Sequence, residues 1–352
     1  MNQERTRIYE SIKSRIGNTP LVQYEGIVPN GNRIFIKREC DNPFGSHYDR
    51  VYLALFKNYE EQGLIQPEQK VIETSSGSAG ISFAGIGKIL GYECYAAMPA
   101  GGEKAREEAL LKQLPTPGHL ILTPAEQYVN GFPRFIKRFL VKNRDYFFLN
   151  HSMGKYDPKT KKVLNNEVAL KSLEDITSEI TRSIDIDVFI PAFGNGTSIV
   201  GPVRKLKQIN PLSKTIAYES LQSGAGYSRM FPKKYEELFG INPGTLSRHR
   251  LPGTSYNGTL TDRMPHLNTA FEENMIDDIM LVSDKKQDDE LQRLNGNRNS
   301  ENLPHWDNFI YQDLGRSSRA GMVVALEIAK STKNKNIVVV AYDKAERYDS
   351  EN

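Results

Sequence analysis

Short apolar runs alternate with stretches of helical spacing through most of the chain. The runs that predict strands lie at 34–36, 70–73, 93–98, 119–123, 146–149, 187–191, 215–219, 279–282 and 336–342. The helical patterns lie at 4–15, from 48 onward, and at 81–90, 103–114, 132–142, 163–181, after the turn 194–198 through 208, and at 318–331. Residues 222–275, rich in Gly, Pro, Ser and Tyr, are expected to be irregular. Repeated strand–helix units of this kind predict an α/β fold with parallel-rich sheets covered by helices.

Composition narrows the class of protein. The chain has 352 residues and a formal net charge of +3, which is too small to indicate nucleic-acid binding. No apolar run approaches 18 residues, so we expect no membrane span, and residues 1–16 lack an apolar leader segment. The two cysteines, Cys40 and Cys94, do not have a metal-ligand spacing and favour a reduced, cytoplasmic protein.

The most informative stretch is Asn42-Pro43-Phe44-Gly45-Ser46-His47-Tyr48-Asp49-Arg50, which follows the apolar run 34–36. Asn-Pro is a turn signal, Gly45 allows unusual backbone angles, and Ser46 is a good N-cap. The stretch therefore predicts a strand, a tight turn and a helix start. Exposed backbone N–H groups at such a place favour anions.

This stretch resembles the active-site motif of the fold type II pyridoxal-phosphate (PLP) enzymes, the cysteine synthase and cystathionine β-synthase group. The family pattern is Asn-Pro-x-Gly-Ser-x-Lys-Asp-Arg, and its lysine carries PLP as a Schiff base. Every fixed position matches except the lysine, which is Tyr48 here. A phenol cannot form an imine, so covalent attachment of PLP is not available at this position.

The resemblance extends over about residues 15–342, beginning with Gly17-Asn18-Thr19-Pro20-Leu21. It implies the tryptophan synthase β-like fold, with two α/β domains and the cofactor between them. By analogy, residues 44–150 form the smaller domain, and residues 1–43 and 151–352 form the larger one. The family also implies a homodimer, and Tyr48 is expected to face the cleft between the domains.

Two loops resemble ligand-binding loops of the family. Thr74-Ser75-Ser76-Gly77-Ser78-Ala79-Gly80 is similar to the loop that grips the substrate carboxylate, which implies that role for Ser75, Ser76, Gly77 and Ala79. Ser78 replaces the asparagine that contacts the cofactor ring hydroxyl, and its side chain is shorter. Gly194-Asn195-Gly196-Thr197-Ser198 is similar to the phosphate cup, with two glycines and two hydroxyls. The alternative for each loop is an ordinary strand–helix turn without a ligand.

Further candidates are less specific. The family places a serine at the cofactor's pyridine nitrogen, which implies Ser318 by register, or Ser317; plain N-capping is the alternative. His151 occupies the place of a glutamine near the substrate carboxylate, and His47 adjoins Tyr48. Either histidine is a candidate acid–base group, although a packed or surface role is the commoner one. Lys37 is the nearest lysine upstream of Tyr48, and the family commonly has a lysine there without a Schiff base.

Two functional interpretations follow. The resemblance implies a PLP-dependent β-elimination or β-replacement enzyme of amino-acid sulfur metabolism that lacks the usual lysine. Alternatively, the chain is an inactive pseudoenzyme that binds PLP noncovalently, or another phosphorylated metabolite, in a regulatory or partner-binding role. A third interpretation, an active enzyme with a deliberate substitution, is disfavoured because several site positions deviate together.

Overall fold

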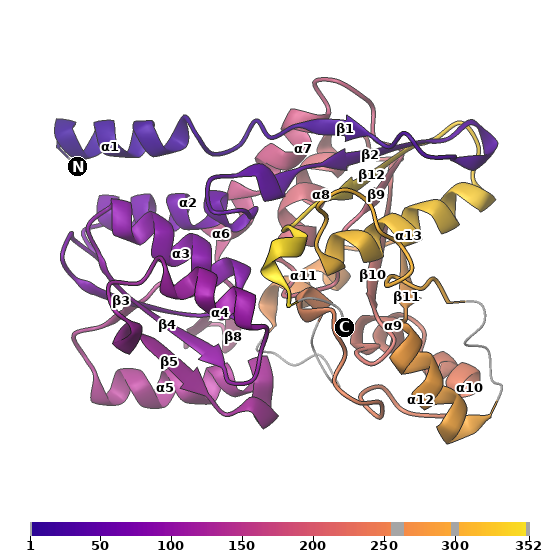
Figure 1. Ribbon diagram of the computed structural model, residues 1–352. Coiled ribbons are helices and arrows are strands. Elements are labelled where there is room, and N and C mark those ends of the chain that lie inside the picture. Colours follow the sequence, from indigo (N-terminus) through magenta and orange to yellow (C-terminus); the bar gives the residue numbers. More distant parts are fainter. Residues whose placement is uncertain (1, 255–263, 297–302, 350–352) are drawn as a thin grey trace. The chain divides into compact units, whose positions relative to one another are not determined.

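The computed structural model describes residues 2–254, 264–296 and 303–349, and the chain divides into two compact units (Figure 1). Unit 1 comprises residues 1–19, 39–173 and 342–352, and unit 2 comprises residues 20–38 and 174–341. Each unit contains its own sheet, which confirms the expected α/β fold.

Unit 1 is built on a four-stranded parallel sheet. Its strands are β3 (Lys70–Thr74), β4 (Glu93–Pro99), β5 (Leu120–Thr123) and β6 (Phe147–Phe148), in the order β5-β4-β3-β6. Its helices are α1 (Gln3–Lys13), α2 (Tyr48–Glu61), α3 (Ser78–Ile89), α4 (Lys104–Leu111), α5 (Phe132–Lys142) and α6 (Glu167–Ser172). Helix α3 packs on β3 and β4, and α2 packs on α3. Four of the five residues of β3 are buried, as a covered parallel strand requires.

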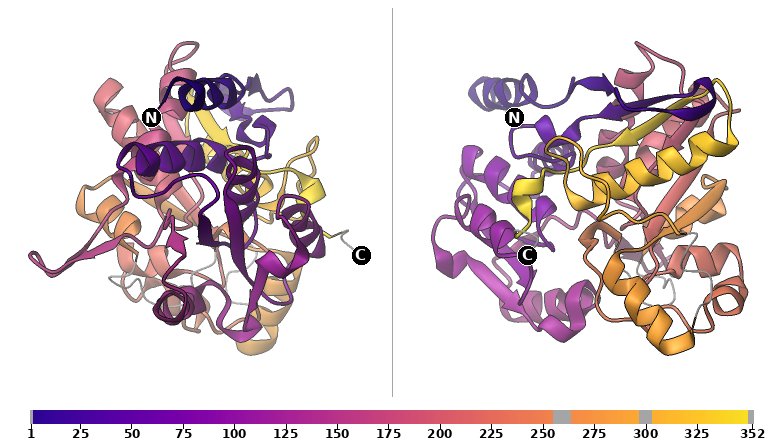
Figure 2. Two further views of the ribbon diagram at one scale, coloured as in Figure 1. Left: turned by 90° about the vertical axis from the view of Figure 1, so that its left-hand side faces the viewer. Right: turned by 45° about the vertical axis from the view of Figure 1, so that its right-hand side comes forward.

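Unit 2 has a six-stranded sheet in the order β1-β2-β12-β9-β10-β11. The strands are β1 (Leu21–Gln23), β2 (Arg33–Lys37), β9 (Val188–Ile190), β10 (Lys214–Ser220), β11 (Asp278–Val282) and β12 (Asn336–Val340). Only the edge pair β1–β2 is antiparallel among these pairings. The helices are α7 (Glu174–Ile180), α8 (Thr197–Ile209), α9 (Ala225–Met230), α10 (Lys234–Phe239), α11 (Pro265–Glu272), α12 (Lys285–Asn295) and α13 (Arg316–Ser331). Helix α13 lies along the sheet beside β12, both yellow in Figure 2.

The two compact units group residues differently from the predicted domains. Residues 1–19 join residues 44–150 because α1 packs on α2, where Arg5 forms an ion pair with Glu60. Residues 151–173 join them because α6 also packs on α2. The carboxyl-terminal residues 342–349 belong to unit 1 through ion pairs and hydrogen bonds that are described below.

Three local expectations need correction. The helix predicted at 163–181 is interrupted, because Val163 lies in a hairpin of β7 (Lys155–Asp157) and β8 (Lys162–Leu164), seen projecting in the left view of Figure 2. Two short helices follow, and the Asn166 side chain caps the first. Residues 222–275 are less irregular than expected, because α9, α10 and α11 lie there; residues 255–263 fall outside the described ranges. Helix α12 was not predicted.

Candidate active site

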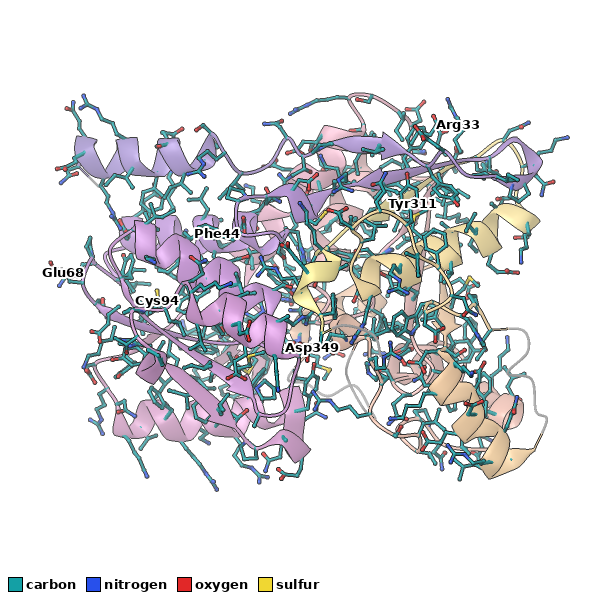
Figure 3. All side chains as sticks on the ribbon, in the orientation of Figure 1. Arg33, Phe44, Glu68, Cys94, Tyr311 and Asp349 are labelled. Carbon is teal, nitrogen blue, oxygen red and sulfur yellow. The ribbon has the colours of Figure 1, made fainter. Side chains whose placement is uncertain are left out.

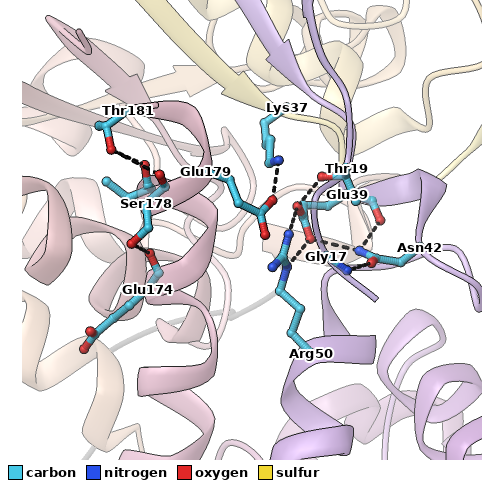
Figure 4. Close-up of polar contacts among 11 residues, drawn as sticks. Gly17, Thr19, Lys37, Glu39, Asn42, Arg50, Glu174, Ser178, Glu179 and Thr181 are labelled. Atoms are coloured by element: carbon cyan, nitrogen blue, oxygen red, sulfur yellow. Dashed lines mark hydrogen bonds and ion pairs between the residues drawn. The ribbon is translucent and has the colours of Figure 1, made fainter. Parts of the chain in front are cut away.

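The turn before α2 is held by a buried polar network (Figure 4). The Glu39 carboxylate accepts two hydrogen bonds from the Arg50 guanidinium, both at 2.8 Å, and one from the Thr19 hydroxyl at 2.7 Å. It also accepts from the Asn42 amide at 2.9 Å, while the Asn42 carbonyl oxygen accepts from the backbone N–H of Gly17 at 2.8 Å. Residues of the motif at 17–21 and of the motif at 42–50 are therefore linked to one another, directly or through Glu39, and these contacts fix the turn.

Helix α2 begins at Tyr48, as the sequence predicts. Gly45 has a φ of 76°, so the turn needs the freedom of glycine there. Ser46 does not occupy the N-cap position, which is His47 without a side-chain cap. The Ser46 hydroxyl still accepts a hydrogen bond from the Tyr48 backbone N–H at 3.2 Å, so it caps the helix from one residue further upstream.

The three candidate catalytic residues lie together in an aromatic cluster. The rings of His47 and Tyr48 have centroids 4.1 Å apart, and the His151 ring meets Tyr48 edge-on at 5.3 Å. Tyr342 meets His47 edge-on at 5.1 Å. Burial lowers the pKa of His47 to about 4, so its imidazole is neutral at physiological pH. His47 is therefore a packing and hydrogen-bonding group at neutral pH rather than a cation.

The His151 ring contacts Tyr52 and Glu73 through the same nitrogen, Nδ1. Its Nδ1 lies 3.0 Å from the Tyr52 hydroxyl and 3.3 Å from Oε2 of Glu73. The same Glu73 oxygen accepts from the His151 backbone N–H at 3.2 Å, and the other oxygen accepts from the Thr74 N–H at 2.8 Å. All three side chains are almost completely buried. Sequence reasoning missed Glu73 and Tyr52; the only signal was an acidic residue directly after the apolar pair Val71-Ile72.

Asp49 joins the turn to α3. Its carboxylate accepts from the Ser82 hydroxyl at 2.6 Å and from the Phe44 backbone N–H at 2.7 Å. Burial raises the pKa of Asp49 to about 7, against the lowering effect of these hydrogen bonds.

The loop that precedes α3 is organised by its own first serine. The Ser75 hydroxyl accepts from the backbone N–H groups of Gly77 at 3.0 Å and Gly80 at 2.8 Å. Ser78, the residue at the family's asparagine position, donates its hydroxyl to Oδ2 of Asp343 at 3.1 Å. The backbone N–H groups of Gly77 and Gly80 and the hydroxyl of Ser78 therefore already have partners within the chain.

Arg106 of α4 packs against Gly77 of this loop. Its guanidinium donates to Asp343 at 2.8 Å and to the Tyr348 hydroxyl at 2.6 Å. A Cβ at Gly77 would lie 2.7 Å from Cδ of Arg106, so only glycine fits there. The following Asp349, labelled in Figure 3, accepts from the backbone N–H groups that begin α4. The carboxyl-terminal segment thereby links the loop to the aromatic cluster, since Tyr342 contacts His47 and its neighbour Asp343 contacts Ser78.

In unit 2, the predicted phosphate cup forms the start of α8. Gly196 is the N-cap with a φ of 91°, and its missing Cβ would lie 2.6 Å from the backbone nitrogen of Leu267. The Asn195 side chain accepts from the Thr197 N–H at 3.0 Å. The Thr197 hydroxyl lies 3.0 Å from Nδ1 of His266. Thr197 is therefore engaged within the protein, and His266 was not foreseen because its segment was expected to be irregular.

Gly253 lies between this turn and the start of α13. A Cβ on Gly194 would lie 2.6 Å from the carbonyl oxygen of Gly253, and a Cβ on Gly253 would lie 2.8 Å from Oγ of Ser317. Ser317 and Ser318 are buried in the first turn of α13, whose N-cap is Gly315. N-capping by either serine is therefore wrong; their role toward a pyridine nitrogen stays a prediction.

Lys37 is not a spare amine. Its Nζ forms a 2.6 Å ion pair with Oε2 of Glu179 (Figure 4), and the two side chains are 2% and 9% exposed. A protonated, paired amine lacks the lone pair that imine formation needs.

The site residues fit PLP in part. The N-terminus of α8 is the kind of position that favours an anion, and Gly194, Asn195 and Ser198 in the turn before it and in its first turn are half-exposed. Neither position 48 nor Lys37 offers an amine for covalent attachment. Within the described ranges, no group of His, Cys, Asp and Glu is arranged to hold a metal ion, and none of the helices there is long and apolar enough to cross a membrane.

Comparison with known proteins gives consistent matches. The sequence profile of the family described as pyridoxal-phosphate dependent enzyme matches residues 12–286. A cysteine synthase of Staphylococcus aureus strain N315 is 29% identical over 241 residues, covering 68% of this chain and 74% of that protein. A cystathionine beta-synthase of Apis mellifera is 26% identical and covers 99% of this chain and 62% of that protein. The structure of a hydrogen sulfide-producing enzyme from Fusobacterium nucleatum matches with a TM-score of 0.72 at 25% identity, over 96% of this chain and 98% of that one.

Proposed function

The chain belongs to the pyridoxal-phosphate dependent enzyme family, and we propose that it is a cysteine synthase-like member that binds PLP noncovalently. The observation that carries this proposal is Tyr48. The matching motif residues around it form an intact network, yet the residue itself is an aromatic ring packed on His47 and His151. The amine of Lys37, the nearest lysine upstream of Tyr48, is paired with Glu179.

The turn 194–198 would hold the phosphate through its backbone N–H groups, and Ser317 or Ser318 would meet the ring nitrogen. The loop residues Ser75, Ser76, Gly77 and Ala79 would hold the carboxylate of an amino acid of sulfur metabolism. When bound, PLP supplies the electron sink for β-elimination or β-replacement. By family resemblance, we further propose a cytoplasmic homodimer with small-molecule ligands.

A second candidate function is a pseudoenzyme that binds PLP or another phosphorylated metabolite as a regulator. One observation favours it: the hydroxyls of Ser78 and Thr197, two predicted cofactor contacts, have partners within the chain, Asp343 and His266. Binding that depends on backbone donors alone tolerates several phosphorylated ligands.

Titration of the purified protein with PLP, followed by dialysis, tests the proposal. We expect saturable binding in calorimetry, competition by inorganic phosphate, and complete removal of PLP by dialysis. Absence of binding would contradict both candidates, whereas retention of PLP after dialysis in denaturant would contradict noncovalent binding. Turnover of O-acetyl-L-serine with sulfide in the presence of PLP distinguishes the enzyme from the regulator.

A further inference from the structure

The group Tyr52–His151–Glu73 has features that packing alone does not require. The Glu73 carboxylate on the buried strand β3 accepts from the backbone N–H of His151, and its Oε2 also lies 3.3 Å from Nδ1 of the same residue. The Tyr52 hydroxyl approaches the same ring nitrogen at 3.0 Å. The rings of Tyr52 and His151 lie next to that of Tyr48, with centroids at 6.5 and 5.3 Å.

The contacts of the imidazole with Tyr52 and Glu73 are both made at Nδ1, so Nε2 is the nitrogen left for a ligand. A carboxylate beside Nδ1 favours the tautomer in which Nδ1 carries the proton and donates to Glu73. Nε2 then has its lone pair free. A histidine oriented in this way by a carboxylate is the arrangement used for general bases.

We propose that His151 is the proton-transferring residue of this site, with Nε2 as the working atom, and that Glu73 and Tyr52 are its positioning residues. The inference rests on the proposed function, in which a bound amino acid has no lysine to move its α-proton. The proton moves from the α-carbon to Nε2 and a solvent proton returns, so the exchange consumes nothing.

The first test needs no ligand. In protein labelled with ¹⁵N-histidine, nitrogen chemical shifts should show His151 protonated at Nδ1 and bare at Nε2. Glu73→Gln should shift the proton to Nε2, because the new amide can donate to Nδ1. Tyr52→Phe should keep the Nδ1–H form, since Glu73 remains. A wild-type spectrum with the proton on Nε2 would overturn the inference.

The second test measures exchange of the α-proton of L-serine in D₂O with PLP added. Exchange above the PLP-only rate is expected for the wild type and should fall by about 100-fold in His151→Gln, the usual contribution of a general base. His119→Gln is the matched control, because His119 contacts Glu93 at 3.3 Å elsewhere in unit 1. Equal exchange in wild type and His151→Gln, or none with PLP bound, would overturn the inference. If PLP does not bind, the proposed function fails, and the tautomer test still decides the orientation of His151.

Discussion

Lys37 and Glu179 form a buried ion pair between strand β2 and helix α7, with 2.6 Å between Nζ and Oε2. This contact decides a functional question, because Lys37 is the nearest lysine upstream of the missing Schiff-base position. Its amine is committed to a carboxylate inside unit 2. We therefore expect Lys37 to contribute to stability rather than to chemistry.

Glu179→Gln should lower the free energy of unfolding by about 3 kcal/mol, because it removes the carboxylate that pairs with the buried Lys37 ammonium. Glu327→Gln is the control, since Glu327 pairs with Lys330 on the exposed face of α13 and should cost less than about 0.5 kcal/mol. Urea denaturation of both variants checks the prediction. Equal losses would show that the Lys37–Glu179 pair is not what stabilises this region.

Gly196→Ala should damage both stability and anion binding. The residue has a left-handed backbone, and the new Cβ would lie 2.6 Å from the backbone of Leu267, which cannot move as a side-chain tip can. Gly101→Ala is the control, because Gly101 has a φ of 67° but open space around it. We expect Gly101→Ala to lower the free energy of unfolding by about 1 kcal/mol, from the backbone conformation alone. Gly196→Ala should lower it by roughly 1–3 kcal/mol more, from overpacking.

Calorimetry with PLP measures the second effect of the same pair of variants. Gly196→Ala should weaken binding, because a shifted turn no longer presents its N–H groups to the phosphate. Gly101→Ala should leave the affinity as in the wild type. Unchanged affinity in a folded Gly196→Ala protein would mean that the phosphate is bound elsewhere.

Asp49 should make a pH-dependent contribution to stability. Burial raises its pKa to about 7 from an unfolded value of 3.8, so between about pH 4 and 7 the folded state holds a proton that the unfolded state has released. Stability from this group therefore falls as the pH rises through that window, with a slope of up to about 1.4 kcal/mol per pH unit.

The neutral variant Asp49→Asn isolates this contribution. His47 acts in the opposite sense, because its pKa is lowered to about 4, so the total stability profile mixes the two groups. From pH 4 to 7, the free energy of unfolding of the wild type should therefore fall relative to that of Asp49→Asn. A difference that is flat with pH would show that Asp49 is ionised throughout.

Much of the fold was predictable because its elements are local. Strands such as β9 are short, wholly apolar runs, and the turn at Gly45 follows from residue types alone. The break before Asn166 was missed because Val163 and Leu164 continue a helical spacing, and only pairing with β7 makes them a strand. Local pattern does not record which partner a segment will find.

The candidate site was predictable where a motif marks it and not where distant residues complete it. Tyr48, His47 and His151 were named, and the structure brings their rings together. Asp343 follows the last strand, 265 residues after Ser78, so no spacing could reveal that its carboxylate takes the Ser78 hydroxyl. His266 reaches Thr197 in the same way, across a fold that the sequence does not display.

The last prediction concerns covalent chemistry at position 48. Treatment of the wild-type protein and PLP with borohydride should leave the chain mass unchanged, because neither the Tyr48 phenol nor the paired Lys37 amine forms an imine. Tyr48→Lys should gain one reduced PLP at residue 48, since the network of Glu39, Arg50 and Asn42 still fixes the turn. Activity need not return with the attachment, because Ser78 still donates to Asp343. Peptide mass spectrometry locates the adduct, and reduced PLP on Lys37 of the wild-type chain would contradict the noncovalent proposal.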